Sequence, residues 1–111
     1  MEFNINKLPE VISEEHFLLL LDDLVQQKDN RSKYTIIQYL DILGEKFQKF
    51  YKANVINEKQ RNNLLNMVIE FTNFTDLNLT EDLIGLMFQF KIDGYKYFLK
   101  SNLNFIKDKV E

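Results

Sequence analysis

The sequence predicts an all-α protein: a single domain spanning residues 1–111 that folds as a compact bundle of about five helices. Only three glycines and one proline occur in 111 residues, too few for the many tight turns of an all-β domain. Apolar residues instead recur at spacings of three and four, and Ser, Asn and Thr stand where helix N-caps belong. With 45% hydrophobic and 28% charged residues, the composition is that of a globular domain with one modest core.

The first helix is predicted over residues 14–28. Ser13 is a natural N-cap, and Glu14 and Glu15 in the first turn offset the positive end of the helix dipole. The buried stripe of this helix comprises Phe17, Leu18, Leu20, Leu21, Leu24 and Val25.

His16, the only histidine, raises the question of a metal or acid–base site in this helix. The positions three and four residues after it, which share its face, hold Leu19 and Leu20. His16 and Asp23 do share a face, but they are two turns apart, about 10.5 Å along the axis. We therefore expect His16 to be a structural or exposed residue, with no metal bound.

The second helix is predicted to follow the N-cap Ser32 and to end at residues 53–54. Its seam has the heptad spacing 4, 3, 4, 3 over Ile36, Leu40, Leu43, Phe47 and Phe50. Gly44 lies beside this seam, where it either lets a neighbouring helix approach closely or is simply tolerated.

The third helix is predicted to begin after Asn57, with Gln60 completing a capping box. Its stripe is Leu64, Met67, Val68 and Phe71. The short connection before it predicts that the second and third helices form an antiparallel hairpin.

Residues 72–79 form the longest predicted irregular segment. Thr80 is the expected N-cap of the fourth helix, with Glu81 and Asp82 in its first turn, and Gly94 the expected C-cap. A fifth helix is predicted over residues 95–109. Its stripe is Leu99, Leu103, Ile106 and Val110, flanked by Phe98 and Phe105. The last four helices are thus expected as two antiparallel hairpins.

No motif for chemistry is found. The chain has no cysteine, no nucleophile motif and no phosphate-binding glycine loop. Adjacent acids on a helix point about 100° apart, so they cannot work as a facing pair. The sequence predicts no enzyme activity, no cofactor and no catalytic residue. The start lacks a secretory signal, and the longest apolar run, residues 17–21, is far below the ~20 residues of a membrane helix. We expect a soluble cytoplasmic protein.

Charge alternates along the chain. Residues 1–29 carry seven acids and two bases, 30–61 three acids and seven bases, 62–93 five acids and one base, and 94–111 two acids and four bases. Such blocks suit neighbouring helices with complementary surfaces, which is the favoured interpretation. In the alternative, the first and third blocks share an acidic face for a basic partner.

Two sets of residues are candidates for binding a partner protein. Asp22 and Asp23 lie mid-helix, where the dipole does not explain them, and Glu81 and Asp82 form a second acidic pair. Residues 83–92 are apolar nearly all round the helix, which predicts burial within the bundle or in an interface. The phenylalanines of this segment and the two tyrosines that follow it are aromatic residues, which are enriched at protein interfaces. The candidates are Asp22, Asp23, Glu81, Asp82, Phe88, Phe90, Tyr95 and Tyr97.

The chain resembles small helical immunity proteins of bacterial toxin–immunity systems, such as those of contact-dependent inhibition. The likeness lies in the Asn/Lys/Ile/Phe-rich composition with capped helices, in the acidic blocks, and in the segment LTEDLIGLMFQFKIDGYKYFLK, residues 79–100. The resemblance implies a cytoplasmic protein that binds one cognate toxin domain and blocks its active site or its access to substrate. Many such toxins are nucleases with basic surfaces, which an acidic helical face would complement.

Two other functions compete. A homo-oligomeric regulator or adaptor would use the fourth helix as a homodimer seam. A nucleic-acid-associated regulator would use the basic zone, but Asp41 and Glu45 interrupt that zone, and no recognition motif accompanies it. The basic zone is Arg31, Lys33, Lys46, Lys49, Lys52, Lys59 and Arg61.

Overall fold

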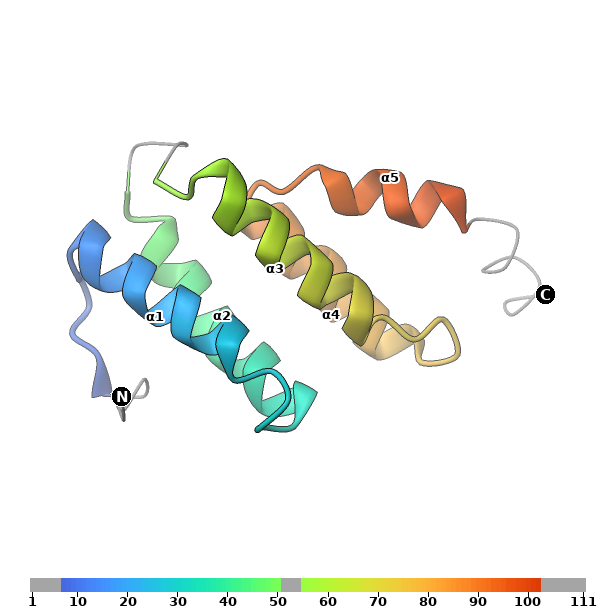
Figure 1. Ribbon diagram of the computed structural model, residues 1–111, viewed down its shortest axis with the longest axis horizontal. Coiled ribbons are helices and arrows are strands. Elements are labelled where there is room, and N and C mark those ends of the chain that lie inside the picture. Colours follow the sequence, from blue (N-terminus) through green and yellow to red (C-terminus); the bar gives the residue numbers. More distant parts are fainter. Residues whose placement is uncertain (1–6, 51–54, 103–111) are drawn as a thin grey trace.

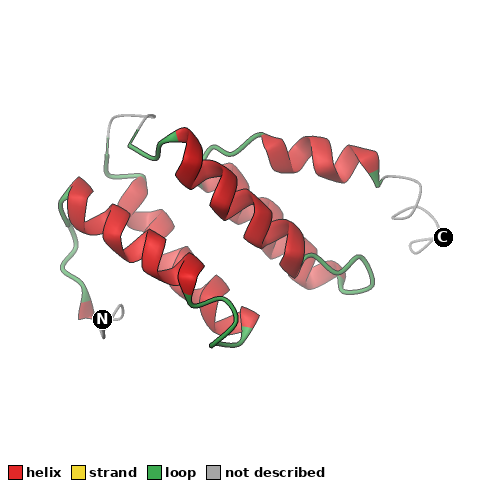
Figure 2. Ribbon diagram, viewed as in Figure 1, coloured by secondary structure: helices red, strands yellow, loops and turns green. Residues whose placement is uncertain are grey.

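The apolar stripes fold as helices in the computed structural model, which describes residues 7–50 and 55–102 (Figure 1). Within these residues the structure consists of helices joined by loops and turns, without strands (Figure 2). The predicted all-α bundle is confirmed. The five helices are α1 (Glu14–Gln26), α2 (Lys33–Phe47), α3 (Glu58–Phe71), α4 (Leu77–Gln89) and α5 (Gly94–Ser101).

The first three helices begin where the capping residues predict. The Ser13 hydroxyl accepts from the His16 backbone N–H at 3.1 Å, and the Ser32 hydroxyl accepts from that of Thr35 at 3.1 Å. Asn57 and Gln60 form the reciprocal capping box, with bonds of 2.8 and 3.1 Å. Each cap satisfies a backbone donor that has no partner within the helix.

Helix α4 begins earlier than the sequence predicts. Its N-cap is Asp76, whose carboxylate accepts from the Leu79 backbone N–H at 3.1 Å. The predicted cap, Thr80, is instead buried inside the helix. Its hydroxyl donates to the carbonyls of Asn73 and Asp76, both at 3.1 Å. Consequently Glu81 lies beyond the first turn, and the helix dipole does not account for its charge.

The end of α4 also differs from the prediction. Lys91, not Gly94, takes the left-handed conformation, with φ 59°. The N–H of Ile92 donates to the Met87 carbonyl at 2.9 Å, and that of Lys91 donates to the Phe88 carbonyl at 3.1 Å. These two bonds form a Schellman motif with lysine at the position that glycine usually occupies.

Replacing Lys91 with glycine is expected to raise the free energy of unfolding by about 1 kcal/mol, because a Cβ is unfavourable in this conformation. The Lys91 side chain is exposed, and Arg61 bonds its backbone carbonyl, which glycine retains. Urea unfolding followed by circular dichroism measures the change. The matched control, Gln38→Gly at an exposed position inside α2, should lose about 0.5–1 kcal/mol. A loss of stability in Lys91→Gly would contradict the left-handed conformation assigned to Lys91.

The remaining helix ends lie near the boundaries of the described residues. Helix α2 ends at Phe47, before the predicted stop at residues 53–54, and positions 51–54 are outside the described residues. Gly94 starts α5 instead of ending α4, and the predicted continuation over residues 103–109 is also outside them.

The helices pair only partly as predicted. In Figure 1, α2 runs antiparallel to α1, α4 runs back behind α3, and α5 extends along the edge formed by α3 and α4. The principal packed pairs are α1–α2, α1–α3, α2–α4, α3–α5 and α4–α5. The expected α4–α5 pair is among them, and the expected α2–α3 hairpin is not. The neighbour that Gly44 admits is α4, since a Cβ on Gly44 would lie 2.5 Å from the Gln89 Cδ.

All five helices contribute to the hydrophobic core. Phe17 of α1 lies at the centre of a ring cluster, with centroids 5.8 Å from Phe47, 5.4 Å from Phe50 and 6.4 Å from Phe90. Phe47 and Phe90 are 5.5 Å apart. This cluster joins α1, the end of α2 and the end of α4. None of the described helices combines the length and the apolar character needed to cross a membrane.

Candidate partner-binding groove between α2 and α4

A groove of about 880 Å³ lies between α2 and α4. One wall comes from the outward side of α2, opposite its buried seam. The other comes from α4 and its N-cap. The lining residues are Tyr34, Ile37, Gln38, Asp41, Gln48, Asp76, Asn78, Leu79, Glu81, Asp82, Gly85, Leu86, Phe88 and Gln89.

The groove carries negative charge. Asp41 from α2 faces the carboxylates of Asp76, Glu81 and Asp82 on the α4 side, and no lysine or arginine is among the described lining residues. Lys33 lies near one lining residue, with its Nζ 5.6 Å from the centroid of the Tyr34 ring. Like charges gathered in one concavity concentrate a negative potential there and attract cations.

These carboxylates are spread along the groove. In the part of the chain that the structure describes, no three acidic or histidine side chains lie close enough together to hold one metal ion. His16 itself is exposed at the start of α1. The arrangement suits a partner with several separated positive charges.

Exposed apolar side chains accompany the charge. Phe88 is 86% exposed and Tyr34 60% exposed. Leu77 and Ile84 are also exposed, and with Glu81 and Phe88 they follow the spacing 4, 3, 4 along one face of α4. An apolar face of this kind, bordered by polar residues, is typical of a protein-binding surface.

Three of the predicted partner-binding residues meet in this groove: Glu81, Asp82 and Phe88. Tyr97 is 67% exposed on α5 and is outside the groove lining. The α2 wall of the groove was not predicted from the sequence. Its signal was the polar side of the second helix, where Tyr34, Gln38, Asp41 and Gln48 lie opposite the heptad seam.

Two other predicted residues belong to the core, which corrects their assignment to a surface. Phe90 is 0% exposed within the ring cluster. Tyr95 is buried, and its hydroxyl shares a 2.8 Å hydrogen bond with that of Thr72. Neither ring can contact a partner in this conformation.

Asp22 and Asp23 are separated from the groove. Asp22 is half-buried and accepts from the Gln60 side chain at 3.4 Å, between α1 and α3. Asp23 accepts from Gln27 at 2.9 Å on its own helix. The structure therefore does not unite the two acidic pairs on one face.

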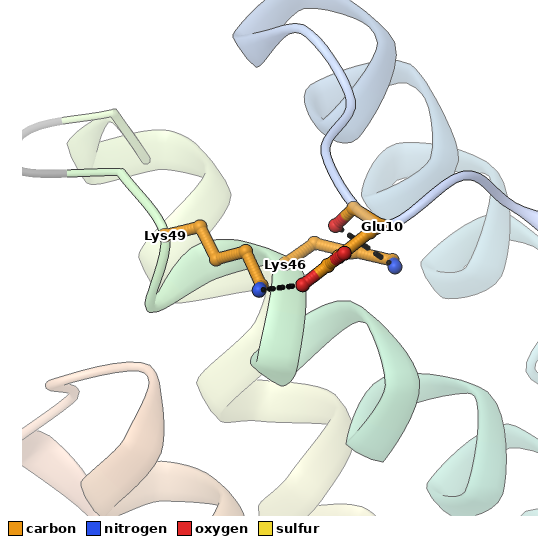
Figure 3. Close-up of polar contacts among 3 residues, drawn as sticks. All are labelled: Glu10, Lys46 and Lys49. Carbon is orange, nitrogen blue, oxygen red and sulfur yellow. Dashed lines mark hydrogen bonds and ion pairs between the residues drawn. The ribbon is translucent and has the colours of Figure 1, made fainter.

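Several residues of the basic zone form hydrogen bonds or ion pairs within the protein. Lys49 forms an ion pair with the Glu10 carboxylate at 3.0 Å, and Lys46 donates to the Glu10 carbonyl at 3.1 Å (Figure 3). The hydrogen bond and charge of Lys49 lower the pKa of the Glu10 carboxyl. Arg61 donates to the carbonyls of Ile56 and Lys91 at 3.2 and 2.9 Å. Lys52 lies outside the described residues.

A second ion pair links the turn after α1 to α3. Lys28 and Glu70 are 2.8 Å apart, and this hydrogen bond and charge raise the pKa of the Lys28 ammonium. The Glu10–Lys49 pair joins an acidic block to a basic one, as the complementary-surface interpretation expects, whereas Lys28 and Glu70 both come from acidic blocks. Both pairs are largely exposed, so each contributes little to stability.

Tyr95 makes stability depend on alkaline pH. Burial raises the pKa of its phenol, and the hydrogen bond with Thr72 opposes that rise. The folded state therefore disfavours the phenolate. The resulting stabilisation is fully present below the unfolded-state pKa of about 10 and is lost as the pH rises through the folded-state pKa.

Between about pH 8 and about pH 10.5, the parent should lose more unfolding free energy than Tyr95→Phe, which has no phenol to ionise. At pH 8 the variant should be about 0.5–1.5 kcal/mol less stable, because the hydrogen bond is gone. Urea unfolding at both pH values tests this, with exposed Tyr97→Phe as the control that should follow the parent. Equal alkaline losses in the parent and in Tyr95→Phe would contradict it.

Comparison of the chain with protein-family models, with curated proteins and with solved structures found no match. The geometry of the groove therefore carries the functional inference.

Proposed function

We propose that this chain is a non-enzymatic protein-binding protein whose α2–α4 groove binds a basic partner. In this proposal it acts as an immunity protein that neutralises a cognate toxin domain in the cytoplasm. The observation that carries the proposal is the groove itself. It combines four carboxylates, no described cationic lining residue, and a phenylalanine that is 86% exposed.

The carboxylates and the exposed rings would contribute to binding in different ways. Carboxylates along the groove would attract a positively charged partner and orient it during encounter. Phe88 and Tyr34 would supply apolar contact area once water is expelled, as aromatic anchors do at interfaces. A toxin that acts on nucleic acid presents a basic surface of the required sign, so an inhibitor seated there would block access to its substrate.

A homodimer is the competing proposal, and the exposed α4 residues Leu77, Ile84 and Phe88 favour it. However, a second copy docked on this face would bring another acidic groove close to the first. Repulsion between the two sets of carboxylates opposes that assembly. A basic partner would instead be attracted to these carboxylates.

The proposal is tested by purifying the tagged full-length chain from its own host and identifying co-purifying proteins by mass spectrometry. We expect one basic protein in near-equal amount whose toxic activity falls when the purified chain is added. The double variant Glu81→Lys with Asp82→Lys should lose this protein. The matched double variant Asp22→Lys with Asp23→Lys, on the other face, should keep it.

Recovery of the chain alone, from cells shown to express the toxin, would contradict the proposal. Light scattering of the purified chain then decides whether a homodimer replaces it. Loss of the partner in the Asp22 and Asp23 variant alone would move the interface to α1.

A further inference from the structure

Gly85 is a glycine that the fold of this chain does not require. It is exposed in the interior of α4, and a Cβ built on it would meet no atom of the described residues within 4 Å. By contrast, a Cβ on Gly44 or Gly94 would press against Gln89 or Leu65. Gly85 also lacks the positive φ that would call for glycine. Among helix-interior residues, only proline is less favourable than glycine.

Gly85 lines the acidic groove. Helical spacing places Glu81 one turn before it and Phe88 one turn after it on the same face. Asp41 lines the opposite wall on α2. A bare stretch of backbone is thus framed by an anionic group on one side and an exposed ring on the other.

We propose that Gly85 is the point at which a cationic amphipathic helix of the partner packs directly against α4. This inference rests on the proposed function and specifies the kind of partner segment. Without a side chain at position 85, the two helix axes can come closer than ordinary side chains allow. The apolar stripe of the incoming helix would contact Phe88 and Ile84, and its lysines or arginines would reach Glu81 and Asp41.

A helix fits this surface better than an extended strand. Both walls are helices that offer side chains, and all described secondary structure is helical, so no described strand edge is free to pair. Charge complementarity selects a cationic helix, because the described lining carries carboxylates without a lysine or arginine.

The test uses a synthetic peptide of about 18 residues, with leucine on one helical face and lysine on the others. One control peptide carries glutamate in place of lysine, and another has the same composition in an order that is not amphipathic. Binding is measured by fluorescence anisotropy at about 50 mM and about 300 mM salt. Chemical-shift mapping locates the bound peptide on the full-length chain.

We expect the lysine peptide to bind at the α2–α4 groove, more weakly at high salt, and both control peptides to bind at least about tenfold more weakly. Gly85→Gln should keep the fold with raised thermal stability and weaken peptide binding at least about tenfold. Gly85→Ala should give a smaller loss. Asn66→Gln, at an exposed position of α3, should change neither property.

Unchanged peptide binding by Gly85→Gln would overturn the inference, even if the Glu81 and Asp82 variant still loses the natural partner. Equal binding of the ordered and reordered lysine peptides would overturn the helical requirement. If instead Gly85→Gln weakens the peptide but no natural toxin is recovered, the inference stands and the proposed function fails.

Discussion

Replacing Phe90 with aspartate is expected to leave the chain unfolded under conditions in which Phe88→Asp folds like the parent. Phe90 is fully buried against Phe17 and Phe47. Removing a buried ring costs about 3–5 kcal/mol, and an unpaired buried carboxylate adds further cost. The total approaches the whole stability of an ordinary domain, about 5–15 kcal/mol. Far-ultraviolet circular dichroism before and after urea addition measures the outcome.

Phe88→Asp is the matched control, because the same change is made two residues away on the same helix. Its side chain lies mostly in water, so we expect a change within about 0.5 kcal/mol. If Phe88→Asp also failed to fold, the exposed position of Phe88 would be wrong. If the parent were a dimer through α4, light scattering should show Phe88→Asp as a folded monomer.

Replacing Phe17 with alanine is expected to lower the free energy of unfolding by about 3–5 kcal/mol. Phe17 contacts the rings of Phe47, Phe50 and Phe90, so its loss leaves a cavity bordered by three elements. The midpoint of urea unfolding should fall sharply with little change in slope.

Leu19→Ala provides the comparison for Phe17→Ala. Leu19 is exposed on the same helix, two residues away, and its truncation should cost little stability. A loss below about 1 kcal/mol for Phe17→Ala would show that the ring cluster is not the centre of the core.

The sequence predicted most of what is local in this fold. Ser13, Ser32 and Asn57 cap α1, α2 and α3 because each places an oxygen beside a backbone donor a few residues along. The apolar stripes of these helices face the core, since helical periodicity alone determines which residues share a face.

Local chemistry was ambiguous at both ends of α4. Asp76 and Thr80 are both capping types, four residues apart, and the choice depends on Leu79 and Thr80 being buried by tertiary packing. Lys91 adopts a left-handed backbone conformation that is usually taken by glycine. The C-cap was therefore predicted at the nearby Gly94. The α2–α4 pairing was not predicted because the close contact of Gly44 with Gln89 joins residues far apart in sequence.

Only part of the candidate site could be predicted from the sequence, because the rest depends on contacts between residues far apart in the chain. Phe88 and Phe90 lie in one apolar run, and the neighbours of α4 decide that one ring is exposed and the other buried. Asp41 appeared only as an interruption of a basic zone. It gains significance when α2 is placed opposite the acids of α4.

The ring cluster has a consequence for the dynamics of the molecule. Its members come from α1, α2 and α4, so the α1–α2 pair alone cannot complete it, and we expect these helices to open together as one cooperative unit. In native-state hydrogen exchange, their central amides should share a single opening free energy. Helix α5 has one fully buried side chain, Tyr95, so its amides should exchange through smaller, local openings while the acidic groove stays intact.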